Sequence, residues 1–232
     1  MSKKKIHIND GFSSELVIGA KFEGILEIPA LNPAKISTPP KYLVPFSRRR
    51  QITDPSKAYI VFYENDDNFT DVIRNPLNYI DEFSKYAGVI SPDNSLYRDT
   101  PFMGQLANIY RNRAVGHVFQ YNGLNVVGNC RWGDERTYSN VIFGEPPAFV
   151  GLPKNSVVAV GTYGCLRDKE NRRHFKNGLY AMIEYLKPKT ILVYGNMPDS
   201  IFGPIKNKVR LVRYDNWLSI CRKGGRNGER AK

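Results

Sequence analysis

Acidic side chains recur in this sequence shortly after apolar runs end. Five of them follow three such runs, and these are Asp66, Asp93, Asp99, Asp134 and Glu135. Carboxylates that converge can hold Mg²⁺ or Mn²⁺ for phosphoryl chemistry, or can act as acid and base when their environments separate their pKa values. We therefore take Asp93, Asp134 and Glu135 as catalytic candidates, and Asp66 and Asp99 as candidate ligand-binding residues. The sequence leaves the identity of any metal open.

The same acids also have a structural interpretation. Asp93 and Asp99 precede Pro101, where a helix is expected to begin, and acidic residues commonly cap helices and stabilise turns. Asp134 lies two residues from Arg136, so these two side chains can pair in a solvated loop. Both interpretations remain open from the sequence.

Basic and aromatic side chains accompany the acids. Arg98 and Arg131 carry planar guanidinium groups, which either neutralise neighbouring carboxylates or bind a phosphate bidentately. Trp132 follows Arg131 directly, an arrangement suited to stacking on a base of a nucleotide or of single-stranded nucleic acid. A Trp that closes one end of the fold is the structural alternative. All three residues are candidate ligand contacts.

Two further polar segments follow apolar runs. The stretch "GTYGC" places Thr162 and Gly164 in a turn before a helix, where free backbone N–H groups can receive an anion. Asn196 follows the next apolar run along the chain. Neither G-x-G-x-x-G nor G-x-x-x-x-G-K-[ST] occurs, so no nucleotide-binding fingerprint supports this anion site. Thr162, Gly164 and Asn196 complete the set of candidate ligand-binding residues.

Alternating strands and helices are expected to position these side chains. Short runs rich in β-branched and aromatic residues predict six strands, at 58–63, 88–90, 124–128, 156–161, 190–194 and 209–214. Helical periodicity predicts helices that span 102–121 and 175–186. Repeated βα units require a mainly parallel sheet, either an open three-layer α/β sheet or an incomplete or TIM-like barrel that borrows strands from the N-terminal region. In both architectures ligands bind at the carboxyl ends of the strands.

The chain of 232 residues suits one domain with appended arms. Residues 1–54 are interrupted by prolines and predict an extended N-terminal arm. Residues 55–218 predict the α/β domain, and residues 219–232 predict a basic, flexible tail. Three widely spaced cysteines without a C-x-x-C pair argue against a disulfide framework and a zinc knuckle. The lack of a long apolar run argues against a signal peptide and a membrane helix. We expect a cytoplasmic protein with no membrane partner.

The formal net charge is +12, and much of it lies in short basic runs. The predicted nucleic-acid contacts are Arg48, Arg49, Arg50, Arg222, Lys223 and Arg226. Such runs are typical of segments that contact DNA or RNA phosphates, although charged segments also keep proteins soluble.

Several longer stretches resemble a family of domains of unknown function from bacteria, phages and mobile elements. They are "GVISPDNSLYRDTP", "YRNRAVG", "RWGDERTY", "NSVVAVGTYGC" and "ENRRHFKNGL", followed by a stretch that begins "LKPKTILVYG". The resemblance extends over about residues 28–215. It implies an α/β domain in a mobile-element setting and no particular activity.

The leading hypothesis is a nucleic-acid-associated protein of a phage or mobile element, with a polar ligand site at the carboxyl ends of its strands. One alternative is a metal-assisted hydrolase that acts on a phosphate ester or a nucleotide. A third hypothesis is a binding module that sequesters a nucleotide without turning it over.

Overall fold

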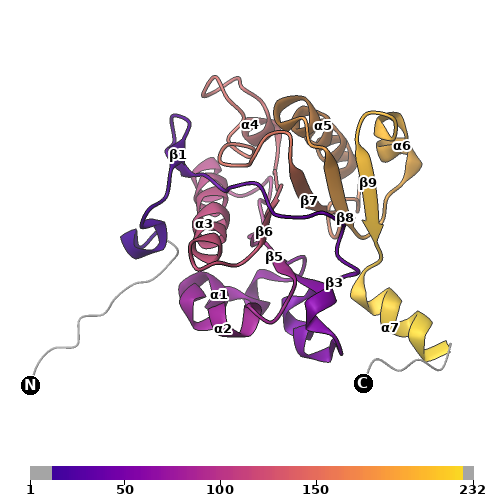
Figure 1. Cartoon of the computed structure of the whole chain (residues 1–232). Helices are drawn as coiled ribbons and strands as arrows, with labels where there is room; N and C mark the ends of the chain where they lie inside the picture. Colours follow the sequence, from indigo (N-terminus) through magenta and orange to yellow (C-terminus); the bar gives the residue numbers. More distant parts are fainter. Residues whose placement is uncertain (1–11, 227–232) are drawn as a thin grey trace, which may run out of the picture.

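A seven-stranded parallel sheet, curled into a half-barrel, forms the centre of the computed structural model, which describes residues 12–226 (Figure 1). Its strands are β3 (Tyr42–Pro45), β4 (Ala58–Val61), β5 (Gly88–Ile90), β6 (Val126–Asn129), β7 (Val157–Gly161), β8 (Thr190–Tyr194) and β9 (Arg210–Tyr214). Their order in space follows their order in the sequence. The chain therefore winds in one direction without a switch point, as in a TIM barrel. The predicted α/β class is confirmed, in its incomplete-barrel form.

Two long helices and several short ones lie on the outer side of the curled sheet (Figure 1). The long helices are α3 (Phe102–Tyr121) and α5 (Lys169–Leu186). The shorter α-helices are α1 (Thr70–Arg74), α2 (Ile80–Phe83), α4 (Glu135–Tyr138), α6 (Asp199–Phe202) and α7 (Trp217–Arg226). The 3-10 helices are η1 (Ser14–Val17), η2 (Phe46–Gln51), η3 (Pro55–Lys57), η4 (Asp66–Asn68), η5 (Pro76–Tyr79) and η6 (Gly203–Ile205), and a hairpin of β1 (Phe22–Glu23) and β2 (Ile28–Pro29) precedes the sheet. None of the helices between residues 12 and 226 has the length and apolar character needed to cross a membrane.

The concave side of the sheet is filled by one apolar cluster to which all seven strands or their ends contribute. Its buried members are Leu43, Tyr59, Val61, Tyr63, Ile90, Val127, Ala159, Leu192, Tyr194 and Tyr214. The convex side packs against the helices through two further clusters. Because both faces are covered, the strands read as continuous apolar runs, a pattern typical of parallel sheets.

The first and last strands approach each other although they are opposite edges of the sheet. The Tyr214 hydroxyl donates a hydrogen bond of 2.7 Å to the Pro40 carbonyl, and Trp217 Nε1 donates one of 3.0 Å to Gln51 Oε1. Trp217 is buried in the same cluster as Val44 on β3. These contacts hold the curl of the sheet across its open side.

Some of the predicted boundaries fall inside these elements. β3 lies within the segment 1–54 that the sequence assigns to an extended arm, and α7 covers the first part of the predicted tail 219–232. Residues 1–11 of the arm and 227–232 of the tail lie outside the described residues. The domain limits themselves stay a prediction.

A conservative substitution tests the closure of the half-barrel. Tyr214→Phe removes the hydroxyl that donates to Pro40 and keeps the ring, so we expect the free energy of unfolding in urea to fall by about 1 kcal/mol. Tyr121→Phe is the control, because Tyr121 is 62% exposed, and it should change stability by less than about 0.5 kcal/mol. Equal effects of the two substitutions would contradict a closing role for the Tyr214 hydroxyl.

Candidate functional site

A pocket of about 760 Å³ opens at the carboxyl ends of four neighbouring strands, β4 to β7. Because the strands are parallel, the segments that follow them meet at this mouth of the half-barrel. The pocket is lined by Tyr63, Glu64, Asn65, Ser95, Leu96, Tyr97, Arg98, Asp99, Cys130, Arg131, Trp132, Gly133, Gly161, Tyr163, Gly164, Cys165 and Arg167, and by Asn171, His174 and Phe175 of α5. We call it the mouth pocket.

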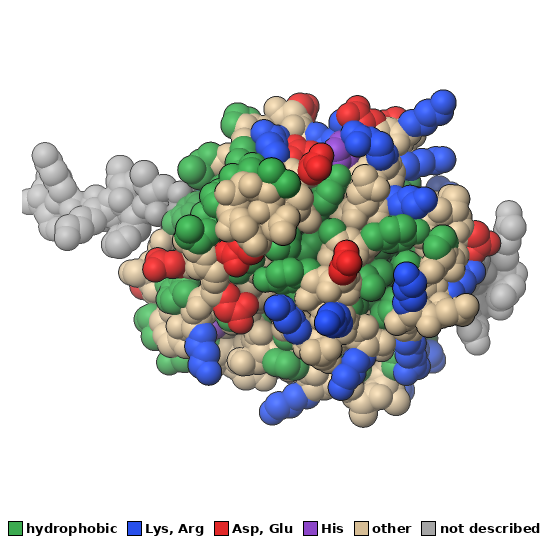
Figure 2. Space-filling view, turned by 90° about the horizontal axis from the view of Figure 1, so that it is seen from above, with side chains coloured by type: hydrophobic (Ala, Val, Ile, Leu, Met, Phe, Trp, Pro, Cys, Tyr) green, Lys and Arg blue, Asp and Glu red, His purple; other side chains and the backbone are tan. Residues whose placement is uncertain are grey.

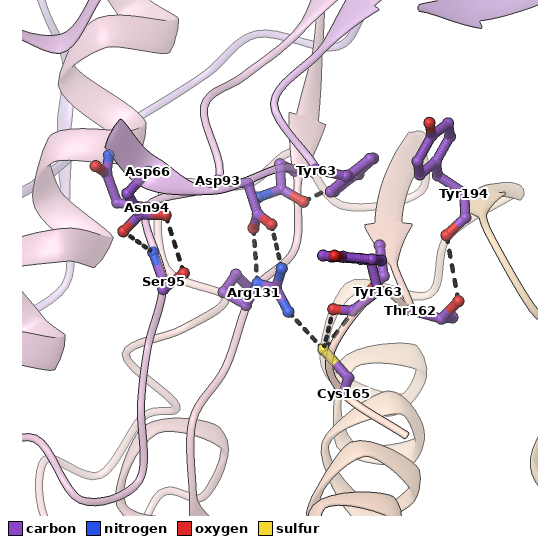
Figure 3. A network of polar contacts seen from close by, with 12 residues as sticks. Tyr63, Asp66, Asp93, Asn94, Ser95, Arg131, Thr162, Tyr163, Cys165 and Tyr194 are labelled. Carbon is purple, nitrogen blue, oxygen red and sulfur yellow. Dashed lines mark hydrogen bonds and ion pairs between the residues drawn. The ribbon is translucent and has the colours of Figure 1, made fainter. Parts of the chain in front are cut away.

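A buried ion pair lies at the floor of the mouth pocket. Arg131 Nε donates to Asp93 Oδ1 at 2.7 Å, and Arg131 Nη2 pairs with Asp93 Oδ2 (Figure 3). Asn129 Nδ2 donates a further hydrogen bond of 2.7 Å to Asp93 Oδ1. Burial raises the pKa of the Asp93 carboxyl, although Arg131 and Asn129 act to lower it. Both oxygens of Asp93 are engaged, so this carboxylate positions Arg131 and is not open to a ligand.

Cys165 extends this network to the segment after β7. Arg131 Nη1 lies 2.6 Å from Cys165 Sγ, and Figure 3 shows the sulfur on the side of Arg131 away from Asp93. Burial raises the pKa of the Cys165 thiol, and burial also raises the pKa of Cys130 to about 12. Both groups are therefore thiols at neutral pH, and neither is activated as a nucleophile.

Tyrosines supply much of the remaining wall. The Tyr63 hydroxyl donates to Asn129 Oδ1 at 3.1 Å, and the Tyr63 ring stacks on Tyr194 with 5.3 Å between centroids. Burial raises the pKa of Tyr63 well above its usual value, so its phenol stays protonated and can donate. Tyr97 and Tyr163 also line the pocket but are 61% and 62% exposed. Figure 3 shows the Tyr163 ring pointing towards the Arg131 side of the site.

The segment after β5 is held in place by Asp66. Its carboxylate accepts hydrogen bonds from the Ser95 backbone N–H at 3.0 Å and from Ser95 Oγ at 2.9 Å. The next contact along this segment is made by Arg98, whose Nε donates to Asn171 Oδ1 at 3.0 Å and whose Nη1 pairs with Glu170. Asp66 therefore holds the segment after β5 from outside the pocket, and Arg98 connects the same segment to the start of α5.

The predicted site residues divide into four groups in the structure. Arg98, Asp99, Arg131, Trp132 and Gly164 line the mouth pocket, and Asp66, Asp93 and Thr162 lie behind that lining. Asn196 lines a second, smaller cavity. Asp134 and Glu135 line neither of these two cavities.

Two of these residues have evident structural roles. Trp132 is buried, donates from Nε1 to the His174 carbonyl, and packs against Phe149 and Phe175. Asp134 caps α4 by accepting from the Arg136 N–H, and it also pairs with the Arg136 guanidinium. Within residues 12–226, no three His, Cys, Asp or Glu side chains form a group that could hold a metal ion.

Several residues of the pocket were not singled out by the sequence. These are Tyr63, Tyr97, Tyr163, Arg167, Asn171 and His174. Tyr63 ends the first predicted apolar run, and Arg167 follows the glycine turn, so extending the strand-end rule by a few residues would have included both. Asn171 and His174 lie on α5, and only the placement of this helix against the mouth identifies them.

The residues predicted to contact nucleic acid differ in how exposed their side chains are. Arg49 pairs with Glu82 at 3.0 Å and stacks on the Phe46 ring, and its side chain is 12% exposed. Arg48 and Arg50 are exposed, as is Arg222 on α7. Lys223 and Arg226 belong to α7, but their side chains lie outside the described part of the chain.

The fold and the site define a parallel α/β half-barrel protein with a polar pocket at the carboxyl ends of its strands. The chain belongs to the family described as "Domain of unknown function (DUF4417)", whose model matches residues 20–215. This confirms the resemblance found in the sequence.

Two similar proteins come from phages. The "Gene 1 protein" of Mycobacterium phage L5 is 28% identical over 173 residues, and that of Mycobacterium phage D29 is 26% identical over 171 residues. Each alignment covers 74% of this chain, with 72% of the L5 protein and 61% of the D29 protein. No solved structure matches the chain. The protein is thus a member of a phage-associated family.

Removing the carboxylate of the buried pair should be costly. Asp93→Asn leaves the Arg131 guanidinium buried without its counter-charge, so we expect the free energy of unfolding to fall by about 3–5 kcal/mol. Asp134→Asn is the matched control; asparagine also caps helices and Arg136 is more exposed, so the expected loss is about 1 kcal/mol or less. Urea denaturation measures both, and similar losses would contradict the structural role of Asp93.

Alkylation should distinguish the three cysteines. Cys221 is exposed, whereas burial raises the pKa of Cys130 and Cys165 and keeps their thiolate fractions low at neutral pH. We expect iodoacetamide to modify Cys221 first, and the rate at Cys165 to rise as the pH increases. Peptide mass spectrometry follows each site. Fast modification of Cys165 at neutral pH would show that its thiol is activated.

Proposed function

We propose that this is a nucleic-acid-associated protein that binds one nucleotide unit in the mouth pocket. The observation that carries the proposal is the pocket itself, because guanidinium groups and exposed tyrosine rings surround one hollow of nucleotide size. Its volume of about 760 Å³ falls in the range typical of small-molecule sites.

Arg167 is the residue best suited to receive the phosphate. It lies at the exposed rim of the pocket, and no hydrogen bond or ion pair engages its side chain among the described residues. It precedes the start of α5, whose N-terminal end carries a partial positive charge. Arg98 is tied to Asn171 and Glu170 at the same end of the helix. The end of α5 is already capped by the Asp168 carboxylate, which accepts from the Asn171 N–H, so the uncommitted guanidinium of Arg167 is the main attraction for an anion at this rim.

Tyr97 and Tyr163 are the residues best suited to receive the base. Most of each side chain is exposed to solvent, yet both line the pocket. Stacking of a base on an aromatic side chain contributes about 1–3 kcal/mol and tolerates any base. Such contacts favour a nucleotide over a small inorganic anion.

Basic segments next to the pocket support association with DNA or RNA. The Ser47 N–H donates a hydrogen bond of 2.9 Å to Glu64, which lines the pocket, and Ser47 is followed by Arg48. The hydrogen bond from Trp217 to Gln51 brings the start of α7, and with it Arg222, to the same segment. Figure 2 shows that Lys and Arg side chains on the face seen from above in Figure 1 are dispersed, with acidic side chains among them. The short basic run that contains Arg48, next to the pocket, therefore supports association with nucleic acid more strongly than the net charge does.

Binding of a nucleoside monophosphate tests the proposal. We expect thymidine monophosphate and adenosine monophosphate to bind the full chain at low salt, and Arg167→Gln to weaken binding by about tenfold. Lys169→Gln removes the same charge from an exposed residue two positions away that lines neither cavity, and it should leave affinity nearly unchanged. Calorimetric titration gives the dissociation constants.

The same titrations separate the alternatives. Binding that is absent in the wild type, or lost equally in both variants, would refute the pocket as the phosphate site. Incubation with Mg²⁺ or Mn²⁺ tests the hydrolase hypothesis, because release of inorganic phosphate from the bound nucleotide would show turnover, whereas binding without release supports a binding protein.

A further inference from the structure

A second cavity of about 400 Å³ lies next to the mouth pocket, on the far side of the segment 165–172. Its polar lining consists of Arg172 from the first turn of α5, Arg213 from β9, and Asn196 and Ser200 from the segment between β8 and the end of α6. Leu166 and the side chains around Ile201 supply its apolar wall. We call it the second cavity.

Two guanidinium groups from separate elements line the second cavity, and Arg172 supplies its uncompensated positive charge. Arg172 is exposed, its Nε donates to the Leu166 carbonyl at 2.9 Å, and none of the ion pairs among residues 12–226 engages it. Arg213 pairs through Nη2 with Asp215 at 3.0 Å, and its side chain is 49% exposed. The amide of Asn196 adds a donor. Planar guanidinium groups around a hollow of this size are suited to a phosphate.

The segment 165–172 forms a wall of both cavities, and its residues line one cavity or the other in turn. Cys165 and Arg167 line the mouth pocket, whereas Leu166 between them lines the second cavity. Asn171 lines the first cavity, and the next residue, Arg172, lines the second. This segment of the chain therefore separates the two cavities.

We propose that the second cavity receives the phosphate of the nucleotide adjacent to the one in the mouth pocket. This inference rests on the proposed function and extends it, because it makes the ligand a strand of at least two nucleotides. The strand is single, since a base that enters a pocket and stacks on tyrosines has left its partner. Arg167 and Arg172 then contact successive phosphates from opposite sides of the shared wall.

Affinity as a function of strand length tests the inference. The probes are thymidine monophosphate, 5′-phosphorylated thymidine oligonucleotides of two and four residues, which carry one phosphate per residue, and a blunt-ended DNA duplex. In the wild type, we expect the two-residue strand to bind at least about fivefold more tightly than the monophosphate. The duplex should bind more weakly than the four-residue strand at the same salt concentration.

Paired substitutions locate the added affinity. In the variant Arg172→Gln with Arg213→Gln, we expect wild-type affinity for the monophosphate and loss of the gain from one to two residues. The control is Lys208→Gln with Arg210→Gln, which removes the same charge from exposed residues that line neither cavity and should keep the gain. Thermal denaturation verifies that both variants fold, and ribonucleotide strands of the same lengths distinguish RNA from DNA.

Each outcome bears on one of the two proposals. If the wild type does not bind the monophosphate, the proposed function fails. If the monophosphate binds but length adds no affinity, or the gain survives loss of Arg172 and Arg213, the second cavity is not a phosphate site. A control variant that loses the gain equally would attribute it to general charge and overturn the inference. A blunt-ended duplex that binds as tightly as the strand would overturn single-strand recognition.

Discussion

The mouth of the half-barrel depends on the ion pair between Asp93 and Arg131. Asp93 follows β5, Arg131 follows β6, and Cys165, which Arg131 also contacts, follows β7. One guanidinium thus links the ends of three neighbouring strands. Removing two charges from water is costly, and only close geometry with further hydrogen bonds offsets that cost. The hydrogen bond from Asn129 to Asp93 supplies such a contact and makes the pair a rigid floor.

A second buried arginine supports this floor from the outer side of the sheet. Arg113 of α3 donates to the carbonyls of Asn129, Ala148 and Val150, and burial lowers the pKa of its guanidinium to about 10. Because the Asn129 carbonyl ends β6, this contact fixes the backbone that carries Asn129 and Arg131. The positive charge is met by carbonyl dipoles, which satisfy its donors without introducing another carboxylate near the pocket.

The sequence predicted the positions of the site better than the roles of its residues. The six predicted strands are present because their β-branched runs are buried on both faces, and parallel strands carry the residues after them to one mouth. β3 is not among the six strands predicted from apolar runs, because prolines surround and end it, but the barrel alternative did call for a strand from the N-terminal region. A strand at the edge of a sheet tolerates Pro45, which needs no N–H in the ladder. The role of Trp132 depends on tertiary contacts with α5, which spacing along the chain cannot supply. The pairing of Asp134 with Arg136 is local, and it is one of the two interpretations that the sequence left open for Asp134.

The three arginines of the mouth pocket differ in how far other side chains engage their guanidinium groups, and this engagement falls from the floor of the pocket to its rim. Arg131 is fully engaged by Asp93 and Cys165, Arg98 is tied to α5 through Asn171 and Glu170, and Arg167 stands exposed at the entrance. A guanidinium that is already paired gains little from a new anion, because binding must first break or share an existing contact. Recognition of a charged ligand is therefore expected at the rim, while the floor supplies shape and rigidity. This division explains how a pocket rich in arginine can remain close to electrically balanced in its interior and still attract anions at its entrance.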